Sequence, residues 1–306
     1  DESDASFTHL QPMIAIVTNI DNDHLATHGG NFESLKQSFV DFLHNLPFYG
    51  LAVLCTDDAN VRAILPKLSR PVIGYGLGEG VDLRAVNVRR DGLRTHYTAL
   101  RRGADCGLEV TVNLAGLHNV QNSLAAIAVA QELGVADGVI QRALANFQGI
   151  DRRLQHIGDV ALHGGPVTVI DDYGHHPAEI AATLDAVRQG YGGRRIVLAF
   201  QPHRYSRTRD LLDDFASVLS TADALLVTEV YAAGEAAIPG ADGRAICRAV
   251  RSRGQVEPVF VEKAEELPQA LAAVIAPGDV VVMMGAGSIS TVAHELPARL
   301  ARETAL

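Results

Sequence analysis

The chain has 306 residues, of which 47% are apolar and 20% are charged, and this is enough for two globular domains of ordinary size. Its formal net charge of -10 argues against a broad nucleic-acid surface, which needs a basic face. No run of ~18 apolar residues offers a membrane span, and the acidic start Asp1–Asp4 is unlike a secretory signal. We therefore expect neither a nucleic acid nor a membrane as a partner.

Three cysteines lie far apart, at Cys55, Cys106 and Cys247. They are odd in number and form no CxxC pair, so neither a disulfide framework nor a thiolate zinc site is indicated. This pattern favours a reducing, cytoplasmic compartment.

The first half of the chain alternates between strands and helices and then changes to hairpins. Its apolar runs and helically spaced apolar residues predict strands at 14–18, 51–55 and 71–75, and helices at 31–46, 59–68, 119–133 and 138–147. Apolar and polar residues alternate over 82–114, which predicts antiparallel hairpins. The fold class is therefore α/β, with a parallel sheet covered on both faces and a small antiparallel β portion.

A domain boundary is expected between Gly149 and Ile150, which divides the chain into 1–149 and 150–306. Beyond it, a hairpin leads into a second series of strands and helices, which is typical of a doubly wound, Rossmann-like domain. The expected strands are 154–162, 167–170, 196–200, 224–228, 259–261 and 280–284, and helices begin near Pro177, Ser206, Gly243, Ala264 and after Ser288.

Ligands bind outside the carboxyl ends of strands in such sheets, so the residues at those ends are candidates for a site. After the first strand, Asp21, Asp23 and His24 crowd one loop. A solvated turn explains this crowding as well as a metal site does. In the second interpretation Glu2 joins His24 on Mg²⁺, for which Mn²⁺ can substitute.

Two asparagines open the helix expected after Gly116. Asn119 and Asn122 are three residues apart and share a face of its first turn. Helix capping explains one of them, whereas both amides together suit a base or ribose edge. At the domain boundary, Arg153 belongs either to a solvated linker or to a site that contacts phosphates.

Two further clusters follow strands of the second domain. In the first, Asp171 and Asp172 precede Tyr173, His175, His176 and Pro177; the alternative to a site is a capping turn with an incidental histidine pair, and a zinc site lacks a further ligand. In the second, His203 precedes Arg204 and Arg207, whose i,i+3 spacing suits a carboxylate clamp, although a solvated basic turn is the alternative. The GAGS string at 285–288 is a weak phosphate-loop signal.

The chain has three lysines, Lys36, Lys67 and Lys263, and none lies in a GxxxxGK[ST] loop. A protein that binds a nucleoside triphosphate on this plan needs that lysine from another segment.

Several strings together resemble the Mur ligase family. They are DESD (1–4), TNIDNDH (18–24), FLHNLPFYG (42–50), GLHNVQN (116–122), DDYGHHP (171–177), FQPHRYSRTRD (200–210), VYAAGE (230–235) and GAGS (285–288). The resemblance implies an N-terminally truncated central domain for ATP and metal at 1–149 and a Rossmann-like amino-acid-binding domain at 150–306. A UDP-sugar domain and the phosphate-binding loop are then expected before Asp1.

Among members of the family, the strings look most like those that join L-alanine to UDP-N-acetylmuramate through an acyl phosphate, with ATP and Mg²⁺, in peptidoglycan synthesis. The resemblance implies metal ligation by Glu2 and His24, and nucleotide binding by Asn119, Asn122, Arg153 and Asp172. It implies catalytic roles for Arg153, Asp172 and His175, and substrate binding by Tyr173, His175, His176, His203, Arg204 and Arg207. A related ligase with another acceptor and a non-catalytic nucleotide-binding module are the alternatives. The isolated chain is expected to be inactive, and its oligomeric state stays open.

Overall fold

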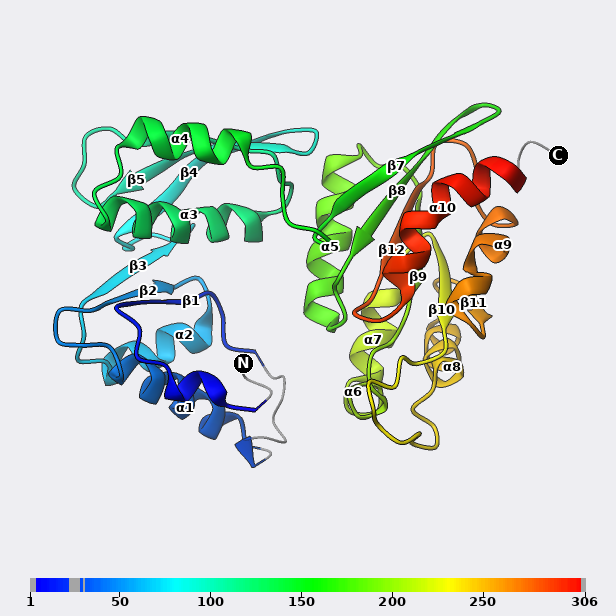
Figure 1. Ribbon diagram of the computed structural model, residues 1–306, viewed down its shortest axis with the longest axis horizontal. Helices are drawn as coiled ribbons and strands as arrows, with labels where there is room; N and C mark the ends of the chain where they lie inside the picture. Colours follow the sequence, from blue (N-terminus) through cyan, green and yellow to red (C-terminus); the bar gives the residue numbers. More distant parts are fainter. Residues whose placement is uncertain (1–3, 22–27, 30, 304–306) are drawn as a thin grey trace. The chain divides into compact units, whose positions relative to one another are not determined.

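The computed structural model describes residues 4–21, 28–29 and 31–303. The chain separates into two compact units, Asp1–Phe147 and Gln148–Leu306, each with its own hydrophobic core (Figure 1). The boundary expected from the sequence lies two residues beyond this division.

Within the described part of the first unit, the strands form one sheet in the order β1-β2-β3-β4-β5-β6. Strands β1 to β4 pair in parallel, and β4 to β6 pair as antiparallel hairpins. The strands are β1 (Ile14–Val17), β2 (Leu51–Cys55), β3 (Val72–Gly76), β4 (Leu83–Asp91), β5 (Arg94–Arg101) and β6 (Leu108–Val112). The helices are η1 (Ser6–His9), α1 (Phe32–His44), α2 (Ala59–Ile64), η3 (Leu65–Lys67), α3 (Leu117–Glu132) and α4 (Asp137–Asn146).

Strand β2 is apolar at every position because both faces of this sheet are covered. Leu51, Val53 and Cys55 belong to the core beneath α3 and α4, whereas Ala52 and Leu54 belong to the core with α1 and α2. Figure 1 shows the two helix pairs on opposite sides of the strands.

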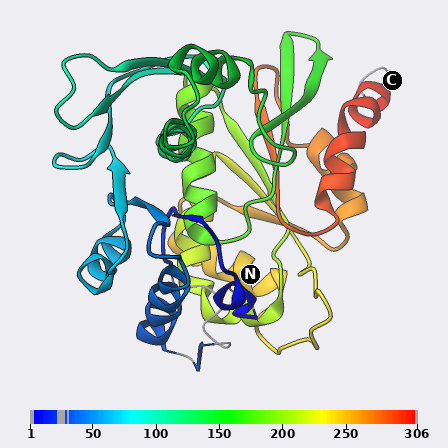
Figure 2. The same cartoon turned by 60° about the vertical axis from the view of Figure 1, so that its left-hand side comes forward.

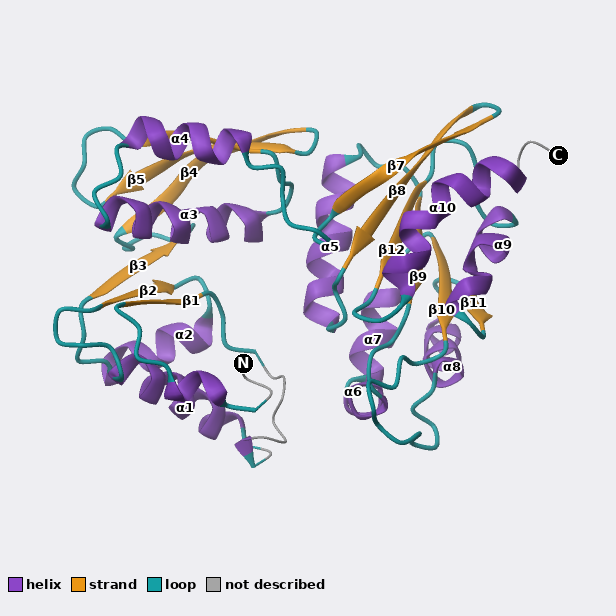
Figure 3. Cartoon of the chain, viewed as in Figure 1, coloured by secondary structure: helices purple, strands orange, loops and turns teal. Residues whose placement is uncertain are grey.

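The second unit contains one sheet in the order β11-β10-β9-β12-β8-β7, in which only the edge strand β7 runs antiparallel (Figure 3). The strands are β7 (Gln155–Leu162), β8 (Gly165–Asp172), β9 (Ile196–Phe200), β10 (Ala224–Thr228), β11 (Pro258–Val261) and β12 (Val280–Met284). The helices are α5 (Pro177–Gly190), α6 (Tyr205–Asp210), α7 (Leu212–Leu219), α8 (Gly243–Arg253), η4 (Ala264–Glu266), α9 (Leu267–Ala272) and α10 (Ile289–Glu303).

Strand β9 shows how this sheet is covered by two helical layers. Ile196, Leu198 and Phe200 pack in the core with α5, α7 and α8, and Val197 and Ala199 pack in the core with α9 and α10. Figure 2 shows α9 (orange) and α10 (red) on the side opposite to α5 (light green). The predicted α/β fold class is therefore confirmed. None of the helices in the described ranges has the length and apolar character that a bilayer span needs.

The structure differs from the sequence prediction mainly where a helix changes direction. The helix expected from Ser206 is two helices, because Leu211 between them has φ −118° and ψ 23°, outside helical geometry. The helix expected from Ala264 begins as the 3₁₀ turn η4, and α9 follows with a proline in its first turn, where a missing N–H costs nothing.

Because the two units have separate cores, a cavity in one is expected to destabilise that unit alone. Phe215 is fully buried in the second unit, so Phe215→Ala is expected to lower its stability by roughly 3–5 kcal/mol. Leu124→Ala is the reciprocal variant in the core of the first unit, and it is expected to lower the stability of that unit by roughly 2–5 kcal/mol. Amide hydrogen exchange resolves the two units; loss of protection in both units from either substitution would contradict separate cores.

Candidate functional site

The loops that follow the strands of the second unit meet at the carboxyl edge of its sheet. The backbone N–H of Gln201, just after β9, donates to the carbonyl of Met284 at 2.9 Å, and that of Gly285, just after β12, donates to the carbonyl of Asp172 at 3.1 Å. The loops after β8, β9 and β12 are therefore adjacent at the edge where doubly wound domains bind ligands.

Asp172 uses its carboxylate to organise this edge. Oδ2 accepts a hydrogen bond from the N–H of Leu154, and Oδ1 accepts one from the N–H of Gly174, both at 2.8 Å. The side chain is only 3% exposed, and this burial raises the pKa of its carboxyl group. Arg152 and Leu154 have φ values of 59° and 51°, a costly backbone conformation, so the bond from Asp172 stabilises a strained turn at the start of the unit.

Asp171 lies beside it and is fully buried. Its Oδ2 accepts a hydrogen bond from the hydroxyl of Ser290 at 2.5 Å, and it lies 3.8 Å from Nε of Arg152 and 3.7 Å from Nε2 of His294. Burial raises the pKa of the Asp171 carboxyl group. This acid therefore joins helix α10 to the end of β8.

The two histidines after these acids have different surroundings. His176 caps α5: its Nδ1 accepts from the N–H of Ala178 at 3.4 Å, while Glu179 accepts from the N–H of His176 at 3.2 Å. His175 is turned toward the site, with its ring centroid 5.2 Å from that of Tyr173 and 5.6 Å from that of His203. The alternative of a capping turn is therefore correct for His176, whereas the ring of His175 does not cap the helix.

Arg153 lies beside the same helix start. Its guanidinium is 3.3 Å from a carboxylate oxygen of Glu179 and 5.5 Å from the ring centroid of Tyr173. The side chain is about half exposed. A surface ion pair of this kind is weak, so it leaves the guanidinium able to exchange its partner for a phosphate.

The two arginines of the basic segment after β9 do not form the predicted clamp on one face of a helix. Arg204 precedes α6, with φ 72°, and its guanidinium is 3.9 Å from Glu235. Arg207 lies within α6, is 8% exposed, and its Nη1 lies 3.4 Å from both the carbonyl oxygen and Nδ1 of His203. Burial, followed by the charges of His175, Arg207 and Arg204, lowers the pKa of His203 to about 4.

The glycines of the GAGS string permit close packing against the loop after β9. A Cβ on Gly285 would lie 2.6 Å from the carbonyl oxygen of Gln201, and one on Gly287 would lie 2.4 Å from Oε1 of Gln201. The same Oε1 accepts a hydrogen bond from the N–H of Ile289 at 3.0 Å. These contacts account for both glycines without a phosphate.

The first unit has a polar pocket of about 240 Å³ at the carboxyl ends of its parallel strands. Its lining comes from the segments after β1 and β2, from β3 and from α3: Thr18, Asn19, Cys55, Asp57, Asp58, Tyr75, His118, Gln121 and Asn122. Asn122 thus reaches the pocket, whereas the side-chain amide of Asn119 donates to the carbonyl of Ala115 at 2.7 Å. Helix α3 begins two residues before Asn119, so Asn119 is not its cap.

Asp57 is a pocket residue that the sequence reasoning missed. Its Oδ2 accepts from the N–H of Leu77 and from Nε2 of Gln121, both at 2.7 Å, and its Oδ1 accepts from the N–H of Gly78 at 3.0 Å. It fixes helix α3 against the turn after β3. The available signal was a pair of acids, Asp57 and Asp58, which begins two residues beyond the end of a buried strand, similar to Asp171 and Asp172 at the end of β8.

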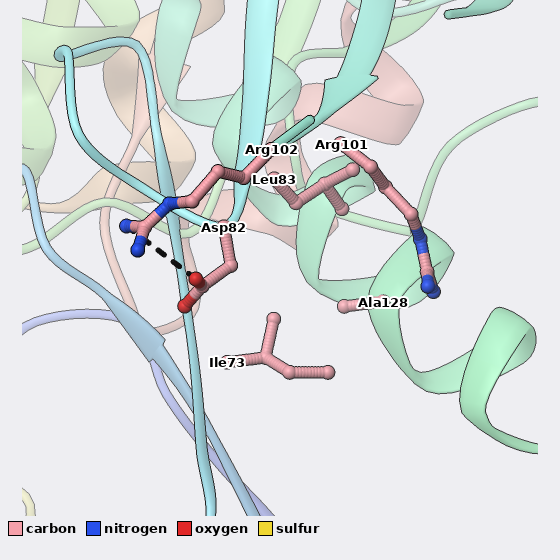
Figure 4. A pocket seen from close by; sticks show the side chains of 6 residues that line it. All are labelled: Ile73, Asp82, Leu83, Arg101, Arg102 and Ala128. Atoms are coloured by element: carbon pink, nitrogen blue, oxygen red, sulfur yellow. Dashed lines mark ion pairs between the residues drawn. The ribbon is translucent and has the colours of Figure 1, made fainter. Parts of the chain in front are cut away.

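A second hollow of the first unit, of about 280 Å³, is lined by residues of β3, β4, β5 and α3 and of the turns beside them (Figure 4). Ile73, Leu83 and Ala128 form its apolar part, while Arg102 pairs with Asp82 at 3.4 Å and Arg101 points the other way. Its basic residues are engaged in local contacts, since Arg101 donates to Gln131 at 2.7 Å. We assign it no role.

The expected metal ligands Glu2 and His24 lie outside the residues that the structure describes. Among those it does describe, no three His, Cys, Asp or Glu side chains are grouped so that they hold a metal ion. The predicted metal site therefore stays a prediction.

Comparison with known proteins identifies both units. The family model of the Mur ligase middle domain matches residues 1–130, and that of the Mur ligase, glutamate ligase domain matches residues 152–287. The chain belongs to the Mur ligase family. The predicted resemblance is thereby confirmed, and the two sheets correspond to these two domains.

Similar Mur ligases extend the match along almost the whole chain. The UDP-N-acetylmuramate–L-alanine ligase of Methylococcus capsulatus is 58% identical over 99% of the chain and 64% of its own length, and that of Paraburkholderia xenovorans is 57% identical over 99% and 65%. The crystal structure of the UDP-N-acetylmuramate-alanine ligase of Thermotoga maritima is 28% identical, with a TM-score of 0.77 over 99% of the chain and 63% of that protein. The chain thus spans somewhat less than two thirds of these relatives.

The predicted site residues of this Mur ligase chain divide between its two domains. Asn119 and Asn122 lie in the middle domain, and only Asn122 lines the polar pocket. Apart from Glu2 and His24, which lie outside the described residues, the others lie at the carboxyl edge of the second sheet or beside it: Arg153, Asp172, Tyr173, His175, His176, His203, Arg204 and Arg207. The strand-end argument grouped these residues as the structure has them, except Arg153, which was expected at the domain boundary. The roles of all of them stay predictions.

The lowered pKa of His203 predicts a contribution to the pH dependence of stability. The folded-state value of about 4 lies below the ordinary value of 6.5, so between these values the unfolded chain binds a proton that the folded chain does not. This contribution reduces stability as the pH falls from about 6.5 through about 4. His203→Gln is expected to lose less stability than the parent between about pH 7 and about pH 5 in urea unfolding. Equal losses would contradict the assignment, and the neighbouring carboxyl groups are common to both proteins.

Replacing Asp172 is expected to lower the stability of the fold, and this effect can be measured separately from any effect on catalysis. Asp172→Ala leaves the N–H groups of Leu154 and Gly174 without their acceptors, so stability is expected to fall by roughly 1–3 kcal/mol. Asp185→Ala, on the exposed face of α5, is the matched control, expected within about 0.5 kcal/mol of the parent. Equal stability of the two variants by thermal unfolding would rule out this scaffold role.

Proposed function

We propose that the protein carrying this chain joins L-alanine to UDP-N-acetylmuramate, with ATP as the energy source, in the synthesis of a peptidoglycan precursor. The observation that carries the proposal is identity of 56–58% along 99% of the chain to proteins named for that reaction. The two polar sites support it, since one suits a nucleotide and the arginines of the other suit the carboxylate of a small amino acid.

In the first step, the lactyl carboxylate of UDP-N-acetylmuramate attacks the γ-phosphorus of ATP, and ADP leaves, so that an acyl phosphate forms. We assign the amide of Asn122 to the nucleotide, in a pocket whose helix Asp57 fixes through Gln121. Arg153 offsets the charge of the transferring phosphoryl group, since its weak pair with Glu179 is readily exchanged.

In the second step, the amine of alanine attacks the acyl carbon, and phosphate leaves from the tetrahedral intermediate. Arg204 binds the carboxylate of alanine, and Arg207 supports the same end of the site through its contact with His203. Tyr173 and His175 form the wall beside it, which limits the side chain to a small one. Holding the amine close to the acyl carbon supplies the rate enhancement of proximity.

A divalent metal ion, Mg²⁺ or Mn²⁺, would offset phosphate charge in this reaction. Glu2 and His24 are its proposed ligands. The steps assigned above to Asn122, Arg153 and Arg204 need no geometry from those two residues.

The proposal predicts a dependence on three substrates. The chain joined to the N-terminal third of the Methylococcus capsulatus relative is expected to release phosphate only with ATP, UDP-N-acetylmuramate and L-alanine together. The 306-residue chain alone is expected to release none, because its three lysines lie outside any phosphate-binding loop. Glycine, L-serine and the bulkier L-leucine are the comparison amino acids, and a preference for any of them over L-alanine would overturn the assignment.

In the same protein, Arg204→Ala is expected to raise the KM for alanine about 10- to 100-fold, the equivalent of one charge-assisted hydrogen bond. Arg209→Ala is the control, because Arg209 is exposed and pairs with its neighbour Asp210 at 2.7 Å. Equal effects of both substitutions would remove Arg204 from the alanine site.

A further inference from the structure

Tyr231 follows strand β10 and is hydrogen-bonded to the segment that carries the basic cluster. Its N–H donates to the carbonyl of Pro202 at 2.8 Å, and its carbonyl accepts from the N–H of Arg204 at 2.9 Å. These two bonds form a short parallel bridge opposite His203. They extend the pairing of β9 and β10 beyond the strands and support the unusual backbone of Arg204, whose φ is 72°.

The ring of Tyr231 stacks on the imidazole of His203. Their planes differ by 10°, and their centroids are 5.6 Å apart, which is an offset stack. The ring has this place because Gly287 has no side chain: a Cβ there would lie 2.6 Å from Cγ of Tyr231. The loop after β12 therefore confines Tyr231 against His203.

Arg207 indicates which nitrogen of His203 carries the hydrogen. Its Nη1, which carries two hydrogens, lies 3.4 Å from both the carbonyl oxygen and Nδ1 of His203, and a guanidinium group only donates hydrogen bonds. Nδ1 is therefore the acceptor, and in the neutral imidazole the hydrogen is on Nε2.

The charges around His203 come from three segments. Arg204 and Arg207 belong to its own segment, His175 comes from the loop after β8, and Glu235 comes from the loop after β10. Burial and the cationic groups disfavour imidazolium, and Glu235 opposes them more weakly, since it accepts hydrogen bonds from Ser206 at 2.6 and 3.0 Å. The environment thus favours the neutral ring that Arg207 orients.

We propose that Tyr231 is a positioning residue which, together with Arg207, holds His203 as the neutral tautomer with hydrogen on Nε2, presented as a hydrogen-bond donor to an oxyanion of the substrate. The oxyanion is the carboxylate of alanine or the acyl phosphate, so this role rests on the proposed function. In this state the basic nitrogen of His203 is Nδ1, which accepts from Arg207 and is therefore not offered to the proton of the attacking amine. That proton leaves through another group.

The tautomer is measured on the chain itself, without substrate, by long-range ¹H–¹⁵N correlation of histidine-labelled protein. Nδ1 of His203 is expected to give the signal of a bare nitrogen and Nε2 that of a protonated one, at about pH 7 and still at about pH 5. Tyr231→Ala is expected to raise the pH at which His203 becomes charged, because the ring loses its cover, and Gly287→Ala should act in the same direction by displacing Tyr231. Tyr231→Phe keeps the stack and should match the parent.

Hydrogen on Nδ1 in the parent, or an unchanged titration in both Tyr231→Ala and Gly287→Ala, would overturn the proposal. Tyr231→Phe and the backbone amide spectrum distinguish lost positioning from lost folding, because general unfolding would change every histidine signal.

Activity in the protein extended with the relative's N-terminal third tests the donor role and separates its two sources. If the oxyanion is the alanine carboxylate, Tyr231→Ala raises the KM for alanine about tenfold; if it is the acyl phosphate, kcat falls instead. In both cases the acid limb of the pH profile of Tyr231→Ala moves to higher pH, whereas that of Tyr231→Phe stays where the parent has it. An unchanged profile in Tyr231→Ala would contradict the donor role. If the parent makes no alanine adduct while the tautomer is as described, the proposed function has failed and the positioning has not.

Discussion

The site of the second domain depends on one close approach of two backbones. The N–H of Gly285 donates to the carbonyl of Asp172, and the carbonyl oxygen of Gln201 lies only 2.6 Å from the position that a Cβ on Gly285 would occupy. Because no side chain intervenes, the ends of β8, β9 and β12 lie together, and their loops deliver acids, histidines and arginines to one edge. A larger residue at this position would separate the loops whose side chains form the cluster. The GAGS string, the weakest signal in the sequence, thus determines how the acidic and basic clusters at the ends of β8 and β9 are arranged.

This convergence has an electrostatic consequence. Burial at the strand ends raises the pKa values of Asp171 and Asp172 and lowers that of His203, so that the edge disfavours charge on these three groups. The arginines keep their charge, and Arg204 is the more exposed of the pair. The site therefore presents positive charge from a few guanidinium groups within an acidic chain, which suits a small anionic substrate.

The strands and the strand-end clusters were predictable from the sequence because they rest on local patterns. The apolar runs 51–55, 196–200, 224–228 and 280–284 coincide with β2, β9, β10 and β12. The partners of each side chain were not predictable, since they depend on contacts between distant segments. Tyr231 bridges to His203 across a helix pair and a strand, and Gln121 reaches Asp57 from 64 residues away. Likewise, Asn119 and Asn122 share a helix turn, but only the structure shows that a backbone carbonyl engages the first of them.

The same use of an acid recurs in both domains and affects how such motifs are interpreted. Asp172 ends a buried strand and Asp57 lies two residues beyond the end of another, and each accepts hydrogen bonds from two backbone N–H groups with its two oxygens. A carboxylate in this arrangement fixes the loops that carry the site. Its loss therefore lowers activity even where it never contacts the substrate. The two effects are separated when stability and catalysis are measured on the same variant. An acid at a strand end therefore indicates where a site lies more securely than it indicates what the acid itself does in the chemistry.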